Sequence, residues 1–536
     1  MTQAMINKAI NFWFGSQDSL YQNAEDIKEC LLSYQQPVYV ITDGIQSFSN
    51  EGVISSQPDS GGKPLTAMLS PIQENQFGSQ SFLKDYGVNW AVYLGAMANA
   101  ITSVEMVVAA GKAGILASFG AAGLSMAKLE ESILAIKAAL PNGPFACNLI
   151  NNIYEPIIEE QTVALYLKHQ VRVIEASAYL RLSGNIVHYR AAGLSRTADG
   201  SVKIANRIIA KVSRKEVAQK FIEPAPQRML DELVQSGKIT AEQAELAALV
   251  PVADDITVEA DSGGHTDNRP LVSLLPTMIA YRDELQVKHQ YPQAVRIGAG
   301  GGISTPASVL AAYMMGADYV VTGSINHASV ESGACLHTRE LLCKAGMADV
   351  IMAPCADMFE MGVKVQVLRS GTFYAMRAQK LYELYSKYES IEDIPVAERE
   401  KIEKQIFKQT LDQIWEGTKQ FFAERDPQQV AKAEADPHKK MALIFRWYLG
   451  LSSRWSVIGD KEREMDYQIW CGPGMGTFND WVKGTYLEGP QNRSVVDITR
   501  QLLRGCAYQY RVQQILLSGV QLPTQIRTYY PEKTLI

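Results

Sequence analysis

The sequence predicts an α/β protein built around a (β/α)8 TIM barrel, with a small N-terminal module and an appended α-helical domain. Three observations predict this. The 536 residues are 47% hydrophobic and 20% charged, an ordinary globular composition. From about residue 88, short apolar runs that end in glycine or polar residues alternate with amphipathic segments. After about residue 340, abundant Glu and Lys accompany apolar residues at helical spacing.

Residues 1–86 are predicted to form a separate small α+β module. The stretch QPVYVITD at 36–43 predicts a strand, and the polar, Ser- and Gly-rich residues 47–64 predict a loop or linker. Residues 1–20 lack the charged, apolar and small-residue order of a signal peptide, and no apolar run is long enough to span a bilayer. We therefore expect a cytoplasmic protein with no membrane partner.

The barrel is predicted over residues 87–340. Its apolar runs are near-continuous, as strands buried on both faces of a parallel sheet require, and eight alternations match a closed barrel better than an open sheet. Residues 186–207 predict an added hairpin with Asp199 and Gly200 at its turn, and 226–250 predict a helical excursion. The runs lie at 89–95, 113–120, 144–150, 171–177, 207–213, 255–261, 294–300 and 318–324.

The rest of the chain is predicted to divide into a helical domain at 341–440 and a C-terminal extension at 441–536 that packs on the barrel. We expect two or three long helices within 376–427, with their charges on solvated faces. The net charge of −6 argues against nucleic acid as a partner. Seven cysteines without a C-x-x-C pair indicate a reducing compartment and argue against a disulfide framework or a zinc site.

Barrel enzymes carry their active sites at the carboxyl ends of the strands, so residues directly after each run are candidates. The small residues of GAMANAI (95–101) either let a flat ligand approach the backbone or pack helix against strand. Asn148, if buried, needs a hydrogen-bond partner, which is either a ligand or a neighbouring backbone group. Lys211 at a strand end either serves the site or extends its ammonium to solvent.

The last two predicted strands end in GAGGGIS (298–304) and TGS (322–324). Such loops often bind phosphate through backbone N–H groups, although Ser304 or Thr305 could instead cap the next helix. A further candidate, His265, follows two glycines just past the sixth run. A lone histidine is more often structural, but a place at the barrel mouth opposite the phosphate loops favours a role in proton transfer. His327 is a secondary candidate.

Taken together, GAMANAI, FACNLI, AKVS, ADSGGHT, GAGGGISTP and GADYVVTGS resemble the flavin-binding barrel of the nitronate monooxygenase and FMN-dependent enoyl-ACP reductase superfamily. Within it, ADSGGHTDNRP and residues 451–487 resemble the PfaD group, the trans-acting enoyl reductases of polyunsaturated fatty acid and polyketide synthases. Simple single-domain relatives usually carry Gly two residues after the histidine. This chain has Asp267 there, which favours the PfaD group.

The resemblance implies an FMN at the barrel mouth and no metal. The FMN phosphate would lie on the glycine-rich loops, and the flat ring would meet backbone and side chains at the other strand ends. His265 would be the catalytic residue. The implied cofactor-binding residues are Ala96, Met97, Asn148, Lys211, Ser262, Gly263, Gly264, Gly301, Gly302, Gly323 and Ser324.

The reaction that the resemblance implies is FMN-dependent enoyl reduction in two halves. NADPH or NADH reduces the flavin, which then delivers hydride to the β-carbon of an enoyl thioester. His265 would polarise the thioester carbonyl or protonate the α-carbon. The substrate would be carried on acyl carrier protein domains, so the helices of 341–440 become the candidate docking and acyl-tunnel region. Because superfamily members are often dimers, a homodimer is also expected.

Three other functions compete with this one. A nitronate monooxygenase on the same barrel leaves the residues after 340 without a role. An enzyme like IMP dehydrogenase needs a nucleophilic cysteine after the sixth strand, where this chain has His265, and Cys335 lies past the eighth strand. A non-catalytic scaffold is disfavoured by the intact glycine loops and His265.

Overall fold

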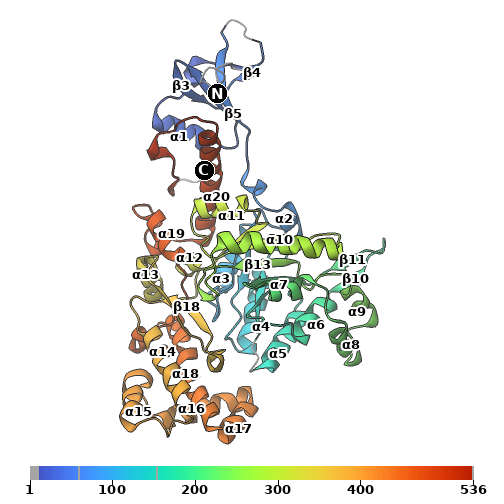
Figure 1. Cartoon of the computed structure of the whole chain (residues 1–536), viewed down its shortest axis with the longest axis vertical. Helices are drawn as coiled ribbons and strands as arrows, with labels where there is room; N and C mark the ends of the chain where they lie inside the picture. The colour runs from blue at the N-terminus through green and yellow to red at the C-terminus, as the bar shows by residue number, and fades with distance from the viewer. Residues whose placement is uncertain (1–10, 58–60, 152–154, 534–536) are drawn as a thin grey trace.

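A computed structural model of the chain describes residues 11–57, 61–151 and 155–533. Residues 1–10 belong to the segment tested for a signal peptide, and residues 58–60 belong to the loop predicted at 47–64. Both stretches lie outside the described residues. Figure 1 shows the N-terminal module at one end of the long axis, the helical domain at the other, and the barrel projecting sideways between them. In the described parts, no helix is both long enough and apolar enough to cross a membrane.

The N-terminal module is a five-stranded antiparallel sheet in the order β3-β2-β5-β1-β4 with one helix against it. The strand predicted at 36–43 is confirmed as β2. The loop predicted at 47–64 is wrong in part, because Phe48 in β3 is fully buried and β4 pairs with β1. Serine-rich flanks hid these short strands. The elements are β1 (Phe12–Phe14), α1 (Ala24–Leu32), β2 (Val38–Asp43), β3 (Ile45–Ser49), β4 (Val53–Ser55) and β5 (Lys63–Leu69).

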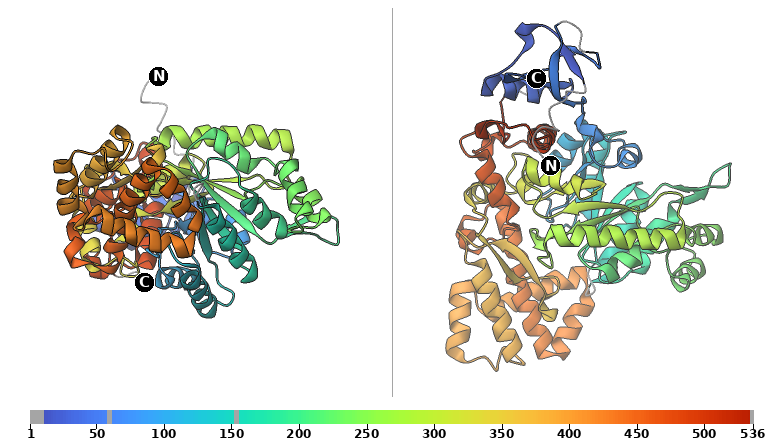
Figure 2. Two further views of the ribbon diagram at one scale, coloured as in Figure 1. Left: turned by 90° about the horizontal axis from the view of Figure 1, so that it is seen from below. Right: turned by 45° about the horizontal axis from the view of Figure 1, so that its top comes forward.

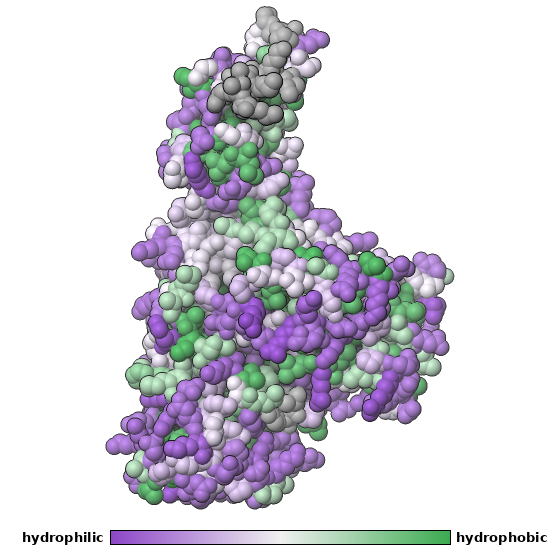
Figure 3. All heavy atoms as spheres, in the orientation of Figure 1, coloured by the Kyte–Doolittle hydropathy of each residue, from purple (hydrophilic) through white to green (hydrophobic). Residues whose placement is uncertain are grey.

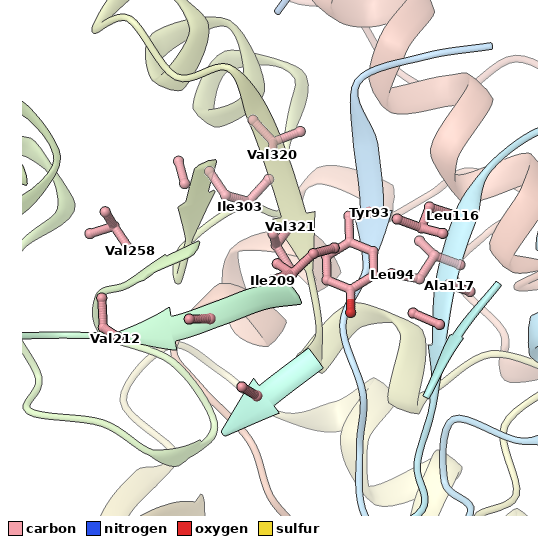
Figure 4. Packing of buried hydrophobic residues seen from close by; sticks show 14 of the residues in the cluster. Tyr93, Leu94, Leu116, Ala117, Ile209, Val212, Val258, Ile303, Val320 and Val321 are labelled. Carbon is pink, nitrogen blue, oxygen red and sulfur yellow. The ribbon is translucent and has the colours of Figure 1, made fainter. Parts of the chain in front are cut away.

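The centre of the molecule is a closed barrel of eight parallel strands, so the predicted fold class is confirmed. Each of the eight predicted apolar runs supplies one strand. Figure 4 shows side chains of these strands, among them Tyr93, Ile209 and Val321, packed in the interior. In barrel order the strands are β6 (Val92–Leu94), β7 (Leu116–Phe119), β8 (Ala146–Ile150), β9 (Val173–Ser177), β12 (Arg207–Val212), β13 (Asp255–Glu259), β15 (Arg296–Gly300) and β16 (Tyr319–Thr322).

Helices connect the strands, and side-chain caps fix where several of them begin. Ser103, Ser125 and Ser183 each accept a backbone N–H two or three residues into the helix that follows. The helices around the barrel are α2 (Gln80–Tyr86), α3 (Val104–Lys112), α4 (Met126–Ala139), α5 (Pro156–Lys168), α6 (Gly184–Ala192), α7 (Lys215–Ile222), α8 (Gln227–Gln235), α9 (Ala241–Ala247), α10 (Leu271–His289), α11 (Pro306–Met314) and α12 (Ser324–His327).

Two insertions lie between strands β9 and β13. The helical excursion predicted at 226–250 is confirmed as α8 and α9. The predicted hairpin is confined to β10 (Leu194–Arg196) and β11 (Val202–Ile204), with Gly200 at φ 86° in its turn. Its first part, residues 186–192, belongs to helix α6 instead, because Ser183 caps a helix whose Ile186, Val187 and Tyr189 are all buried.

A small antiparallel sheet, β14-β18-β17, lies between the barrel and the helical domain (Figure 1) and was not predicted. β14 lies along one edge of β18, and residues 469–471 continue along that edge: the N–H of Leu368 donates to the carbonyl of Ile469 at 2.8 Å. The sheet therefore joins three segments that are distant in sequence. Its strands are β14 (Gly264–His265), β17 (Val350–Pro354) and β18 (Lys364–Leu368).

The long helices predicted within 376–427 are confirmed as α14 and α16. Helix α18 runs across residue 440, and the predicted domain boundaries stay predictions. Figure 2 shows the helical domain beside the barrel from two further directions, and Figure 3 shows a mainly hydrophilic surface over its visible face. The helices are α13 (Leu336–Lys344), α14 (Tyr374–Lys387), α15 (Val396–Ile402), α16 (Leu411–Arg425), α17 (Pro427–Ala435), α18 (Pro437–Ile458), α19 (Gly474–Val482) and α20 (Val495–Leu517).

Candidate active site

A cavity opens at the carboxyl ends of the barrel strands, where enzymes of this fold class carry their active sites. Its walls come from the ends of β6, β12, β13, β15 and β16 and from residues 470–474. Asn148, Gly264 and His265 do not line it. The predicted site residues that do are Ala96, Met97, Lys211, Ser262, Gly263, Gly301, Gly302, Gly323 and Ser324.

The loops after β15 and β16 have the form of an anion cradle. Gly301 and Gly302 have φ of +92° and +73°, which side chains rarely adopt. A Cβ on Gly301 would lie 2.8 Å from the carbonyl carbon of Ala260, whereas the space above Gly302 and Gly323 is open to 4 Å. In the described parts of the chain, no hydrogen bond engages the N–H groups of these three glycines. They are free to bind an anion.

Neighbouring hydroxyls in these loops have different roles. Thr305 caps α11 in a capping box with Ser308, so the capping alternative holds for Thr305. The hydroxyl of Ser324 accepts the N–H of Gly472 at 2.9 Å. Its own proton is left to donate toward the cavity.

Lys211 projects into the cavity between two carboxylates. Its Nζ lies 2.9 Å from Oε1 of Glu259 and 3.6 Å from Oε1 of Glu175. Burial lowers the pKa of Lys211, but the two carboxylates outweigh it, and the pKa is raised overall. Only 17% of the side chain is exposed, so Lys211 is a paired, charged group of the site, and the alternative of extension to solvent does not hold.

Glu175 organises the floor of the cavity and was missed, as was Glu259. Glu175 is fully buried and accepts hydrogen bonds from the hydroxyl of Tyr93 and from the N–H of Ala96, the latter at 3.0 Å. A glutamate within an apolar strand was the available signal in both IEAS and VEAD.

Three of the predicted flavin-binding residues already donate their N–H groups to acceptors within the protein. Besides Ala96, the N–H of Met97 donates to Oγ1 of Thr102 at 2.9 Å. The amide of Asn148 donates to the carbonyl of Glu175 at 3.1 Å and to Ser177 at 3.0 Å, so a neighbouring strand is its partner. A flat ligand would therefore meet Ala96 and Met97 by packing or through carbonyl oxygens.

His265 forms an ion pair that the sequence did not predict. Its Nε2 lies 3.1 Å from Oδ2 of Asp357, and Sγ of Cys355 belongs to the same cluster, whose atoms lie within 4.8 Å of one another. Burial lowers the pKa of His265, but the charge of Asp357 outweighs it and the pKa is raised well above its usual value. Burial raises the pKa of Cys355, whose thiol donates to the carbonyl of Val363 at 3.2 Å. The nearby carboxylate therefore favours the protonated form of the ring.

The loop that carries His265 is held at two further points. The side-chain amide of Gln366 donates to Asp261 at 2.7 Å and to the carbonyl of Ser262 at 2.8 Å. Asp267 accepts two hydrogen bonds from Arg214, both at 2.9 Å, and these lower its pKa to about 2. Asp267 therefore clamps the loop to the end of β12.

The C-terminal extension supplies one wall of the cavity through Trp470, Gly472 and Gly474, which were not among the predicted site residues. A Cβ on Gly472 would lie 2.7 Å from the backbone nitrogen of Gly263, so this wall meets the glycine loop backbone to backbone. His327 is fully buried behind the wall, with Nδ1 at 3.1 Å from the carbonyl of Trp470. Burial lowers its pKa to about 4, and its position supports the wall.

Known proteins resemble this chain over most of its length. Residues 388–467 match the family described as [acyl-carrier-protein] S-malonyltransferase, inserted helical domain. The chain is 48% identical over 500 residues, 92% of its length, to a polyunsaturated fatty acid synthase protein of a Thraustochytrium species. It is 44% identical over 433 residues, 81% of its length, to the polyketide biosynthesis protein PksE of Bacillus subtilis.

One solved structure is similar to this chain over nearly all of the solved structure's length. The enoyl reductase domain of MlnA, from the macrolactin biosynthesis cluster of Bacillus amyloliquefaciens, is 40% identical with a TM-score of 0.78. The similarity covers 83% of this chain and 99% of that domain. By contrast, this chain spans 33% of the Thraustochytrium synthase protein and 56% of PksE, less than two thirds of either relative.

Proposed function

Because this chain belongs to the PfaD-type enoyl reductase family, we propose that it reduces the 2,3-double bond of enoyl thioesters carried on an acyl carrier protein. The reaction would use FMN and NADPH or NADH and would serve polyunsaturated fatty acid or polyketide synthesis. One observation carries the proposal: a glycine-lined cavity at the barrel mouth has, on the loop that forms its rim, a histidine whose Nε2 lies 3.1 Å from the carboxylate of Asp357.

The residues present fit an FMN. The open N–H groups at Gly302 and Gly323, with the hydroxyl of Ser324, would hold its phosphate. Lys211 would face the ring system from β12, and Gly263 lines the cavity with its backbone while Cys471 and Gly472 pack against the side where a Cβ would lie. When bound, FMN supplies hydride transfer between the nicotinamide and the enoyl group.

The protein's own groups would orient the substrate and handle the proton. The imidazolium of His265 would donate a proton to the α-carbon, and the walls at Trp470 and Gly472 would exclude water from the cavity. Lys211 stays charged between Glu175 and Glu259, so it would act as a fixed electrostatic group rather than as a proton donor.

The partner would be an acyl carrier protein domain, docked near the helical domain. Support comes from the match of residues 388–467 to an insert found in an acyl-carrier-protein transferase and from relatives that are synthase proteins. A cytoplasmic location and a homodimer are part of this proposal.

An anaerobic experiment tests the proposal. The purified protein is loaded with FMN and reduced with NADPH, and the return of the oxidised flavin spectrum is followed after mixing with an enoyl thioester of pantetheine or of a carrier protein. Rapid reoxidation is expected, and the His265→Gln variant should slow it by about 100-fold, in the range that general acids contribute.

Other outcomes assign other functions. Reoxidation by oxygen alone, with turnover of a nitronate, would replace the proposal with the monooxygenase alternative. A protein that cannot be reconstituted with FMN would support the scaffold alternative. Flavin absorbance and the melting temperature of His265→Gln serve as controls for its folding.

A further inference from the structure

We propose that Asp357 is the positioning residue for His265: it fixes the orientation of the imidazole and keeps the ring cationic, so that the ring can donate a proton. The step to which this applies rests on the proposed enoyl reduction. A C–H bond forms at the α-carbon as the N–H bond of the imidazolium breaks, and the neutral ring takes a proton back from water. The ion pair itself does not depend on that function.

The small sheet brings the two residues together. On β18, Val365 pairs with His265 of β14 on one side and with Ala353 of β17 on the other. Asp357 lies in the connection just after β17, which ends at Pro354, so the sheet brings its carboxylate close to the imidazole. Nε2 of His265 and Oδ2 of Asp357 are both enclosed, at 3.1 Å from each other.

The rest of the ring stays accessible. A third of the His265 side chain, 33%, is exposed although Nε2 is enclosed. The carboxylate therefore occupies the enclosed side of the ring at Nε2 and leaves the exposed third of the side chain for a substrate. His265 follows Gly263, which lines the cavity, by two residues.

Few other groups can set the charge of His265. Asp357 and Cys355 are the titratable groups that act most strongly on the ring, and burial raises the pKa of the Cys355 thiol. Tyr374 lies behind them, with its hydroxyl donating to the carbonyl of Pro354 at 2.9 Å. Burial raises the pKa of Asp357, but the imidazolium outweighs it and the pKa is lowered. Both partners are thus charged from acidic pH up to the raised pKa of His265.

A purely structural role for Asp357 is weaker, because the loop has other attachments. Gln366 holds Asp261 and Ser262, and Arg214 holds Asp267. Removal of the Asp357 charge should leave these bonds intact and change the histidine alone.

The test is the titration of His265 in the FMN-loaded protein, followed by NMR of 15N-histidine and assigned with His265→Gln. We expect the wild-type ring to stay protonated above pH 7. In Asp357→Asn burial is unopposed, so the ring should titrate below its ordinary pKa of about 6.5. Asp357→Glu should restore the raised value. Asp349→Asn, an acidic residue bound to Ser370 and away from the ring, is the matched control and should titrate as wild type.

The pH profile of enoyl reduction is the second readout. Asp357→Asn should lose at least 10-fold in rate at pH 8 and recover toward pH 5.5, with flavin binding unchanged. A wild-type ring that titrates at or below about 6.5, or an Asp357→Asn ring that titrates as wild type, would overturn the proposal, and the first result needs no folded variant. If wild-type protein does not reduce enoyl thioesters, the proposed function fails, while the titration still decides the ion pair.

Discussion

Lys211 shows how single residues set the chemistry of the cavity. An ammonium this well buried is stable only because Glu175 and Glu259 both face it. Glu175 in turn holds the N–H of Ala96, so the charge cluster also fixes the start of the loop after β6. The cavity floor is therefore a single electrostatic unit that spans β6, β9, β12 and β13.

Removal of the Lys211 charge should destabilise this cluster of charged residues. Lys211→Met leaves two buried carboxylates facing each other, so we expect a loss of about 3 kcal/mol in the free energy of unfolding and loss of bound FMN. Urea denaturation and the flavin-to-protein absorbance ratio measure the two effects. Lys211→Arg keeps the charge and serves as the control. A Lys211→Met protein with wild-type midpoint and flavin content would contradict this role.

Among single residues, the sequence predicted the side chains and glycines at the ends of the barrel strands. It missed the residues that distant segments of the chain bring to the site. The glycines of the anion cradle and Lys211 follow apolar runs, so barrel geometry alone places them at one mouth. Asp357 and Gln366 come from a sheet formed by distant segments, and no local pattern links them to His265. Glu175 stands out in the sequence as a charged residue within an apolar strand, but no sequence pattern indicates that it pairs with Lys211.

The secondary-structure elements divide the barrel into a functional and a stabilising end. The first residues of β13 and β15, Asp255 and Arg296, form a doubly hydrogen-bonded pair at 2.6 and 2.9 Å. Helix α2 closes this end: Asp85 binds Arg296 at 2.7 Å, and the hydroxyl of Tyr86 donates to Asp255. All these groups lie at the amino ends of the strands, opposite the cavity.

This arrangement predicts a variant that separates stability from function. Arg296→Met leaves Asp255 buried without its cationic partner, with the Tyr86 hydroxyl still donating to it, so we expect a loss of about 3–5 kcal/mol in the free energy of unfolding. The affinity for FMN should not change, because the cavity lies at the other end of the strands. Chemical denaturation and flavin titration at low temperature measure both. A large loss of FMN affinity in the folded variant would mean that the two ends are coupled.

Strands and helices were predictable where a single sequence pattern dominated the segment. Buried parallel strands are near-continuous apolar runs, and all eight were located. Helix α6 was assigned to a hairpin because its β-branched residues outweighed the Ser183 cap. Strands β14, β17 and β18 are short, β14 pairs with β18 from a distant segment, and β17 and β18 are joined by residues 355–363 rather than by a tight turn, so the sequence contains no hairpin signal.

On the scale of the whole molecule, the C-terminal extension holds the parts together. Residues 470–474 complete the cavity, and α20 then runs past α11 to the N-terminal module (Figure 1). A Cβ on Gly505 would lie 2.4 Å from Cγ of Pro306, so α20 packs against α11 at close range. The sequence predicted that the extension packs on the barrel, but long-range packing of this kind leaves no local signal of which surfaces meet.

Arg511 is the main polar link between the two ends of the chain. This fully buried residue of α20 donates to the carbonyls of Ser33, Tyr34, Gln36 and Ser70, in the segments that flank the N-terminal sheet. Because buried carbonyls without donors are costly, Arg511→Met should lower the free energy of unfolding by about 2–4 kcal/mol. The cost should fall on the attachment of the module rather than on the barrel.

Limited proteolysis and flavin content distinguish an effect on the attachment of the N-terminal module from an effect on the barrel. We expect Arg511→Met to be cleaved faster between β5 and α2, where the module joins the barrel, with FMN retained by the remaining fragment. Arg511→Lys, which keeps a charge but fewer donors, should fall between the variant and wild type. Cleavage at the wild-type rate would show that apolar packing of α1 against α20 holds the module without the arginine. Loss of FMN together with the module would instead mean that the module, α20 and the cavity wall unfold as one unit.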